Sequence, residues 1–116
     1  MMSVFLSVKM DLGGEGLTFD ETVDTAFTME GARRMLELPT LQWKIWGLDS
    51  DKKQGCGFYL FASIEAAKAY AKQAVLNLQS RQGVSNVTTQ IWTIAEEQTH
   101  ITKGPIDLPQ IKDLKE

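Results

Sequence analysis

The order of the predicted strands and helices most constrains how this chain can fold. Strand patterns cover residues 2–10, 41–48, 55–62 and 84–95, and they are bounded by Gly, Pro and charged turn residues. Helical spacing of apolar residues predicts one helix over about 19–37 and a second between Ser63 and Gly83. The order βαββαβ predicts a ferredoxin-like α+β fold, with two helices on one face of a four-stranded antiparallel sheet.

Local signals define the ends of both predicted helices. Thr18-Phe-Asp-Glu21 matches a capping box, in which the Thr18 hydroxyl accepts from the Glu21 amide and the Glu21 side chain bonds back to Thr18. Pro39 ends the first helix because the residue before proline avoids the helical region. Ser63 is a good N-cap for the second helix, and Gly83 is a typical stop residue.

Apolar residues lie on both faces of the predicted strands. Leu41, Trp43 and Ile45 fall on one face of their strand, while Gln42, Lys44 and Trp46 fall on the other. The glycines Gly55 and Gly57 in the next strand indicate a bulge or a close backbone approach. Helices cover only one face, so the second face would form an exposed apolar patch larger than monomers usually carry. We therefore expect a two-fold symmetric homodimer that packs sheet against sheet.

Size and charge narrow the class of protein. The 116 residues fit one domain over 1–108, followed by a C-terminal tail over 109–116. The formal net charge of −3 argues against nucleic acid and anionic membranes as partners. No apolar run approaches the roughly 20 residues of a membrane span, and no signal peptide is visible. The single cysteine, Cys56, excludes an intramolecular disulfide, and we expect a cytoplasmic location.

Three segments resemble a known family. They are Leu41-Gln-Trp-Lys-Ile-Trp46, Gly57-Phe-Tyr-Leu-Phe61 and the helix opening Ala66-Ala-Lys-Ala-Tyr70, with Gly83-Val84 leading into the last strand. Together they resemble the YdhR-type putative monooxygenases of the dimeric α+β barrel superfamily, over roughly residues 3–108. The resemblance implies a homodimer whose two sheets form a barrel. It also implies an oxidoreductase similar to small oxygenases that oxidise electron-rich aromatic compounds without a cofactor.

Aromatic and polar residues on the strands are the candidate substrate-binding residues. They are Trp43, Trp46, Tyr59 and Trp92, with Lys44 and Gln90 beside them. Aromatic rings of this kind can bind a flat aromatic ligand by offset stacking and by N–H or O–H hydrogen bonds. The same rings could instead fill the helix–sheet layer and the dimer interface. Lys44 could pair with a substrate anion, or lie along apolar surface with its ammonium in water.

His100 is the only histidine, and it is the candidate proton acceptor. As a residue after the last strand it could lie at a pocket mouth, or simply on the surface. One histidine and one cysteine do not make a zinc site. Gly13-Gly-Glu-Gly16 lacks the third glycine of a dinucleotide-binding loop, because Phe19 takes that position.

The resemblance therefore implies a monooxygenase that acts on an aromatic or hydrophobic small molecule, with no metal or other cofactor. Two alternatives stay open. One is a non-catalytic dimeric module that binds a small ligand, and the other is an isomerase or cyclase of the same superfamily. Oxygen consumption separates the monooxygenase from the binding module and from the isomerase or cyclase, because only the monooxygenase consumes O₂.

Overall fold

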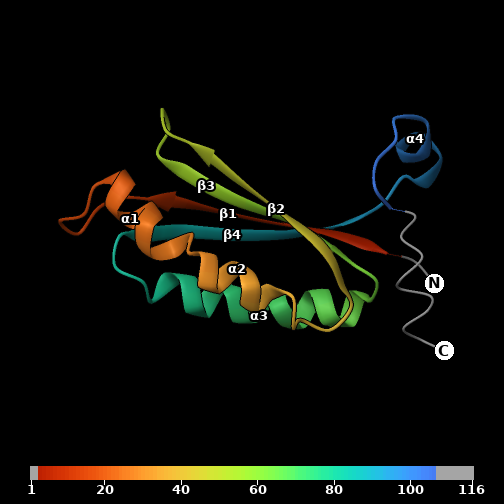
Figure 1. Ribbon diagram of the computed structural model, residues 1–116, viewed down its shortest axis with the longest axis horizontal. Helices are drawn as coiled ribbons and strands as arrows, with labels where there is room; N and C mark the ends of the chain where they lie inside the picture. Colours follow the sequence, from red (N-terminus) through yellow and green to blue (C-terminus); the bar gives the residue numbers. More distant parts are fainter. Residues whose placement is uncertain (1–2, 107–116) are drawn as a thin grey trace.

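The computed structural model describes residues 3–106, which form eight elements (Figure 1). In chain order these are β1 (Val4–Leu12), α1 (Phe19–Ala26), α2 (Met29–Met35), β2 (Leu41–Asp49), β3 (Gln54–Phe61), α3 (Ile64–Gln79), β4 (Val84–Thr93) and α4 (Glu96–Ile101). The predicted tail over 109–116 lies outside the described residues. Among residues 3–106, no helix is long and apolar enough to cross a membrane.

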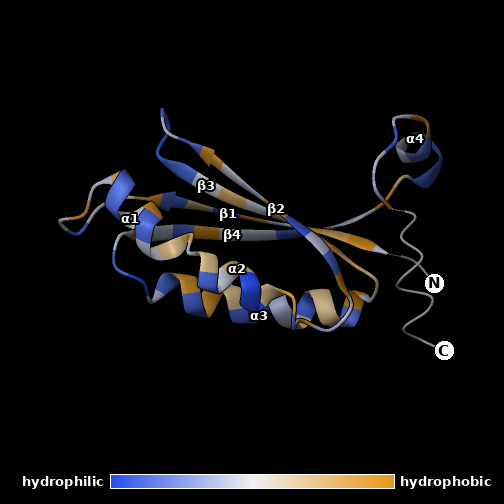
Figure 2. Cartoon of the chain, in the orientation of Figure 1, coloured by the Kyte–Doolittle hydropathy of each residue, from blue (hydrophilic) through white to orange (hydrophobic). Residues whose placement is uncertain are grey.

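The four strands form one antiparallel sheet in the order β2-β3-β1-β4. Helices α1, α2 and α3 lie on the same face of this sheet, whereas α4 lies apart from them, beyond the end of β4 (Figure 1). Apolar and polar residues alternate along the strands and helices instead of forming separate blocks (Figure 2). This arrangement confirms the ferredoxin-like α+β fold that the element order predicts.

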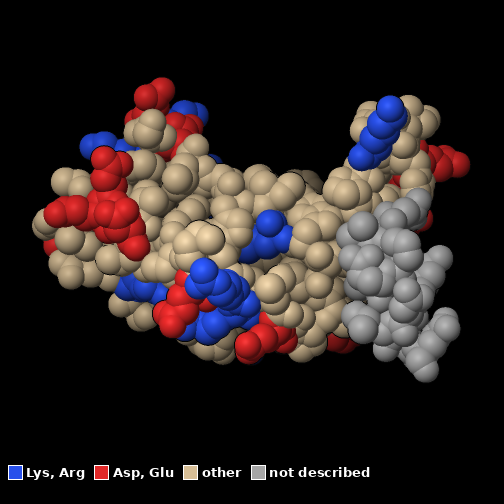
Figure 3. Space-filling model, in the orientation of Figure 1, with Lys and Arg blue, Asp and Glu red and all other residues tan. Residues whose placement is uncertain are grey.

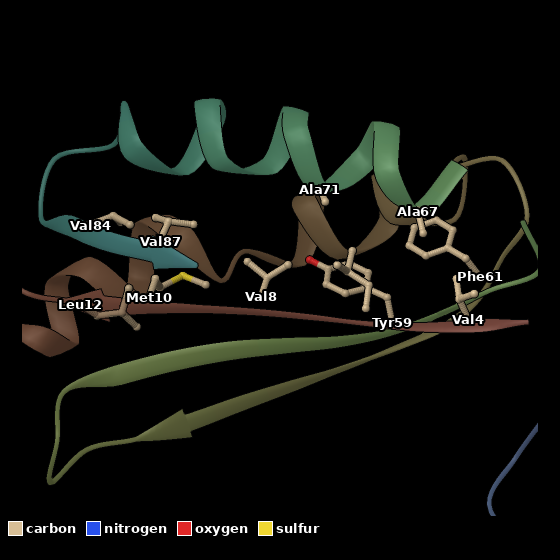
Figure 4. Packing of buried hydrophobic residues seen from close by; sticks show 11 residues of the cluster. Val4, Val8, Met10, Leu12, Tyr59, Phe61, Ala67, Ala71, Val84 and Val87 are labelled. Carbon is tan, nitrogen blue, oxygen red and sulfur yellow. The ribbon is translucent and has the colours of Figure 1, made fainter. Parts of the chain in front are cut away.

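The hydrophobic core follows the central strand β1. Its alternate residues Val4, Leu6, Val8, Met10 and Leu12 are all buried under the helices. Complete burial of one such side chain contributes roughly 1.5–3 kcal/mol to the free energy of unfolding. The opposite side of the core is made by small residues of α3, which let the helix approach closely (Figure 4). These are Ala67, Ala71 and Ala74.

The predicted helix over 19–37 is wrong as one element, because it divides into α1 and α2. Phe27 leaves the helical conformation, with φ −113° and ψ 64°, and ends α1. Thr28 then caps α2, since its hydroxyl accepts a hydrogen bond from the Gly31 amide at 2.9 Å. A threonine hydroxyl satisfies a free amide at a helix start, so a new helix begins there.

The predicted start signals of both helices are confirmed. The capping box is complete: Glu21 N donates to Thr18 Oγ1 at 3.1 Å, and Thr18 N donates to Glu21 Oε1 at 2.9 Å. The Ser63 hydroxyl accepts from the Ala66 amide at 3.2 Å and caps α3. The predicted stop residues do not end the helices, because α2 ends at Met35 and α3 at Gln79, each four residues before Pro39 and Gly83. Gly83 does adopt φ +86°, a conformation that favours glycine.

A bulge changes the predicted faces at the start of β2. Leu41 pairs with Phe61 and Trp43 pairs with Leu60, so Gln42 is the extra residue. Leu41 therefore packs against the core and does not share a face with Trp43. From Trp43 onward the predicted alternation holds, and Lys44 and Trp46 face the helices.

The helix-free face of the sheet carries an aromatic cluster. The Phe5 ring stacks on Phe58 at 5.6 Å and meets Trp43 edge-on at 6.4 Å. Trp43 Nε1 donates to the Pro105 carbonyl at 2.9 Å, which ties the segment after α4 to this face. Nevertheless Ile45 remains 53% exposed and Trp92 45% exposed. We call this surface the open face.

We predict that Gly83→Ala destabilises the fold more than Gly16→Ala. Both glycines have nearly the same φ, +86° and +85°, so both alanines strain the backbone equally. A Cβ at Gly83 would also lie 2.6 Å from Thr22 Oγ1, whereas nothing lies within 4 Å at Gly16. Urea unfolding should show an additional loss of roughly 1–2 kcal/mol at Gly83. Equal losses would contradict the close approach to Thr22.

Candidate functional site

A cavity of about 240 Å³ lies between the helices and the β2–β3 side of the sheet. It is slightly smaller than most ligand sites, which measure roughly 300–1,000 Å³, so it suits a small ligand. Aromatic and thioether side chains from five elements and the α1–α2 junction form part of its walls. They are Met10, Phe27, Met35, Trp46, Tyr59 and Tyr70. We call this cavity the helix–sheet pocket.

Lys44 extends from β2 into the helix–sheet pocket. Its ammonium nitrogen lies 3.4 Å from the centroid of the Trp46 ring and 4.7 Å from that of Tyr59. Contact with aromatic faces favours the charged amine, but removal from water disfavours it. Burial is the larger effect, and it lowers the pKa of Lys44 from 10.5 to about 7. The amine is therefore partly neutral at physiological pH.

Gly57 makes the space that Lys44 occupies. It pairs with Trp46 across the β2–β3 ladder and faces the pocket. A Cβ at this position would lie 2.9 Å from Lys44 Cε and 2.9 Å from Tyr59 Cε1. The close backbone approach predicted for this strand is thus confirmed at Gly57. No bulge accompanies it, because β1 and β3 pair without a register shift.

Two tyrosines form the inner wall of the pocket. The Tyr59 and Tyr70 hydroxyls are 3.1 Å apart, and the Tyr70 hydroxyl also contacts Met35 Sδ at 3.7 Å. Burial raises the pKa of the Tyr59 hydroxyl well above its ordinary value, and the neighbouring Tyr70 raises it further. Burial also raises the pKa of Tyr70, against a smaller opposing effect of the hydrogen bond. Both phenols therefore stay protonated at neutral pH and can donate hydrogen bonds.

The charged side chains that line the pocket are all basic. Arg34 from α2 and Arg81 from the segment after α3 join Lys44, and no Asp or Glu of the described residues lines the cavity. A basic group is visible in the middle of this face, between α2 and β2, within a largely uncharged surface (Figure 3). Residues 3–106 also contain no cluster of three or more His, Cys, Asp or Glu side chains. The site thus favours an anionic organic ligand.

The structure brings together three of the sequence-predicted binding residues, namely Lys44, Trp46 and Tyr59. The prediction that Trp43 and Trp46 point to opposite faces is confirmed by their pairing with Leu60 and Gly57. The remaining candidates lie on the open face or beyond it. Trp43 and Trp92 line a shallow apolar depression on that face. Gln90 pairs with Ser7 on the same face, and His100 lies exposed on α4.

Sequence reasoning missed most of the pocket residues, among them Phe27, Arg34, Tyr70 and Arg81. Phe27 reaches the pocket because α1 ends there, and its ring meets Trp46 edge-on at 5.3 Å. The signal for that end was Thr28, which is a preferred N-cap residue. Tyr70 lies one turn from Ala67 on the buried side of α3, so helical spacing alone could have placed it there.

We predict that Lys44→Met stabilises the protein below pH 7, by roughly 1–3 kcal/mol, because it removes a partly buried charge. Between about pH 7 and 10.5 the unfolded Lys44 binds a proton that the folded form does not. Raising the pH through this range therefore stabilises the wild type relative to the variant. Urea unfolding at several pH values should show that the difference in the free energy of unfolding between the two proteins becomes smaller as the pH rises from about 7 to 10.5. A difference independent of pH would contradict the lowered pKa.

Comparison with known proteins assigns the chain to a family. The family model described as putative mono-oxygenase ydhR matches residues 6–105. This span covers β1 from Leu6 onward, the other three strands and the helices between them, and it includes every residue named above as lining the pocket. Comparison with curated proteins gives no match. The match confirms the resemblance seen in the sequence, and the chain belongs to the ydhR family of putative mono-oxygenases.

Proposed function

We propose that this protein is a cofactor-independent monooxygenase, and that a small aromatic molecule binds in its helix–sheet pocket. The family match supports the reaction class. The observation that carries the choice of site is the aromatic wall formed by Trp46, Tyr59 and Tyr70 around Lys44. Aromatic faces bind flat rings by offset stacking, and a partly enclosed pocket reduces the water around them.

The proposed reaction needs only an electron-rich substrate and O₂. In a hydroquinone, one oxygen atom forms a bond to a ring carbon and the other leaves as water with two substrate hydrogens. The hydroquinone becomes a hydroxyquinone, and it supplies all four electrons that O₂ accepts. The contribution of the protein is to orient the ring and to stabilise its electron-rich form, which positioned hydrogen bonds and charges can do.

We also propose that the active protein is a homodimer joined through the open face. Phe5, Trp43 and Phe58 form an aromatic surface there, and Ile45 and Trp92 project from it. Burying this surface against its symmetric copy would remove apolar area from water, the main driving force of association. Pairing through this face leaves the helix–sheet pocket on the opposite side of each sheet.

The monooxygenase proposal predicts oxygen uptake with 1,4-naphthohydroquinone above the uncatalysed rate, without added metal or flavin. The product should be hydroxynaphthoquinone carrying one oxygen atom from ¹⁸O₂, detected by mass spectrometry. Trp46→Ala should lower the rate at least about tenfold, because the ring loses its stacking partner. Leu76→Ala, at an exposed position of α3 outside both the pocket and the open face, should keep the rate.

Two results would count against this assignment. Uptake that yields only naphthoquinone and hydrogen peroxide would indicate ordinary autoxidation. The hydroquinone could also bind without any oxygen uptake. Calorimetry under argon and in air would measure this binding, and the result would identify a ligand-binding module. An isomerase or cyclase would convert its substrate equally well without oxygen.

The dimer proposal predicts that Ile45→Glu produces monomers, because it places a charge on the open face, beside Phe58 of the neighbouring strand. Sedimentation equilibrium should give the mass of two chains for the wild type and of one chain for the variant. Leu76→Glu is the matched control, since Leu76 is 62% exposed but lies on α3. A monomeric wild type, or a dimer disrupted equally by both changes, would contradict the proposed interface.

A further inference from the structure

We propose that Lys44 selects the ligand: the helix–sheet pocket takes a flat aromatic molecule that carries an acidic oxygen, and the Lys44 amine pairs with that oxygen as its anion. Where the acidic group is a hydroxyl, Lys44 accepts its proton. This inference rests on the proposed function, because it uses the same pocket, and it names the class of molecule and the residue that recognises it.

The first argument is the missing counter-charge. Among the described residues, Arg34 pairs with Glu30 at 3.7 Å, whereas Lys44 forms no ion pair with a carboxylate. Buried charges are normally paired, so a lysine in this position can bind an anion as its partner. The Trp46 and Tyr59 rings beside the Lys44 amine stabilise its positive charge less than a carboxylate would.

The second argument concerns the groups that face Lys44. Tyr59 from β3 and Tyr70 from α3 remain protonated at neutral pH, and the guanidinium groups of Arg34 and Arg81, which line the same pocket, carry hydrogen-bond donors but no acceptor. None of these four can accept a proton from a ligand near pH 7. Lys44 can, because its pKa of about 7 leaves a large neutral fraction, which suits an acid–base group at physiological pH.

The third argument concerns Gly57, the residue beside the Lys44 side chain on the neighbouring strand. A Cβ on Gly57 would lie 2.9 Å from Lys44 Cε and 2.9 Å from Tyr59 Cε1, so glycine leaves the room that Lys44 occupies. The Lys44 amine packs against the Trp46 and Tyr59 rings and does not simply extend along the surface. A positioned amine pairs with an oxyanion at lower entropic cost than a mobile one.

The proton transfer is balanced within the ligand and the protein. The aromatic O–H bond breaks and an N–H bond forms on Lys44, which gives an aromatic oxyanion beside an ammonium ion. No electron moves in this step and no co-reactant is required. The resulting ion pair lies in a partly desolvated site, where a charge-assisted hydrogen bond is stronger than in water.

Three naphthalene probes test the inference by calorimetry at pH 7: 2-naphthoate, 2-naphthol and 2-methoxynaphthalene. The first is already an anion, the second can become one, and the third cannot. We expect the naphthoate and the naphthol to bind at least about tenfold more tightly than the methoxy compound, as for a charge-assisted hydrogen bond. Bound naphthol should also show the red-shifted absorption of naphtholate.

Substitutions at Lys44 separate charge pairing from proton acceptance. Lys44→Met should abolish the preference for the acidic probes and the naphtholate band, while binding of 2-methoxynaphthalene persists. Lys44→Arg should keep the affinity for naphthoate but lose the naphtholate band, because a guanidinium cannot accept the proton. Lys72→Met, at an exposed position of α3, is the matched control and should change neither property.

The outcomes distinguish this inference from the proposed function. If the wild type binds all three probes equally, or if Lys44→Met keeps the preference, the role of Lys44 is overturned and the aromatic pocket stands. If none of the probes binds, both the role of Lys44 and the proposed pocket are overturned. If a naphthalene probe quenches the tryptophan fluorescence of the wild type and of Trp46→Phe equally, the probe binds outside the helix–sheet pocket. Both the role of Lys44 and the proposed pocket are then overturned.

Discussion

The burial of alternate β1 side chains under the helices is the interaction on which the rest of the structure depends. Leu6 and Val8 are completely buried, and β1 is hydrogen-bonded to β3 on one side and β4 on the other. Close contact with the alanines of α3 completes this core. The helices can therefore leave space elsewhere, on the β2 side, without exposing the centre of the sheet.

The pocket forms at Gly57, where the sheet carries no side chain to fill the space under the helices. Gly57 lies on β3 between the strands that carry Val8 and Trp46, and it contributes no side chain to fill the layer. Lys44 and Tyr59 enter the space that results, and Phe27 closes one end because α1 stops there. Removal of water from this small volume gives Lys44 its unusual acidity.

Much of the fold could be predicted from the sequence because its signals are local. The capping box at Thr18, the cap at Ser63 and the period of two in β1 each report on a few neighbouring residues. The site was harder to predict. The alternation of side chains along β2 correctly placed Lys44 and Trp46 on one face. The pairing between strands was needed to show that Tyr59 lies on this pocket face and that Trp92 lies on the open face. The bulge at Gln42 and the helix end at Phe27 depend on tertiary packing, which spacing alone does not report.

The position of β2 at the edge of the sheet has a consequence for how such proteins diverge. Lys44 and Trp46 belong to a strand with a single neighbour, whereas the residues that hold the fold together lie on the central strand β1. Under the proposed function, a substitution on β2 would change which ligand the pocket takes at less cost to folding than a substitution on β1. Binding and folding would then depend largely on different strands of one sheet.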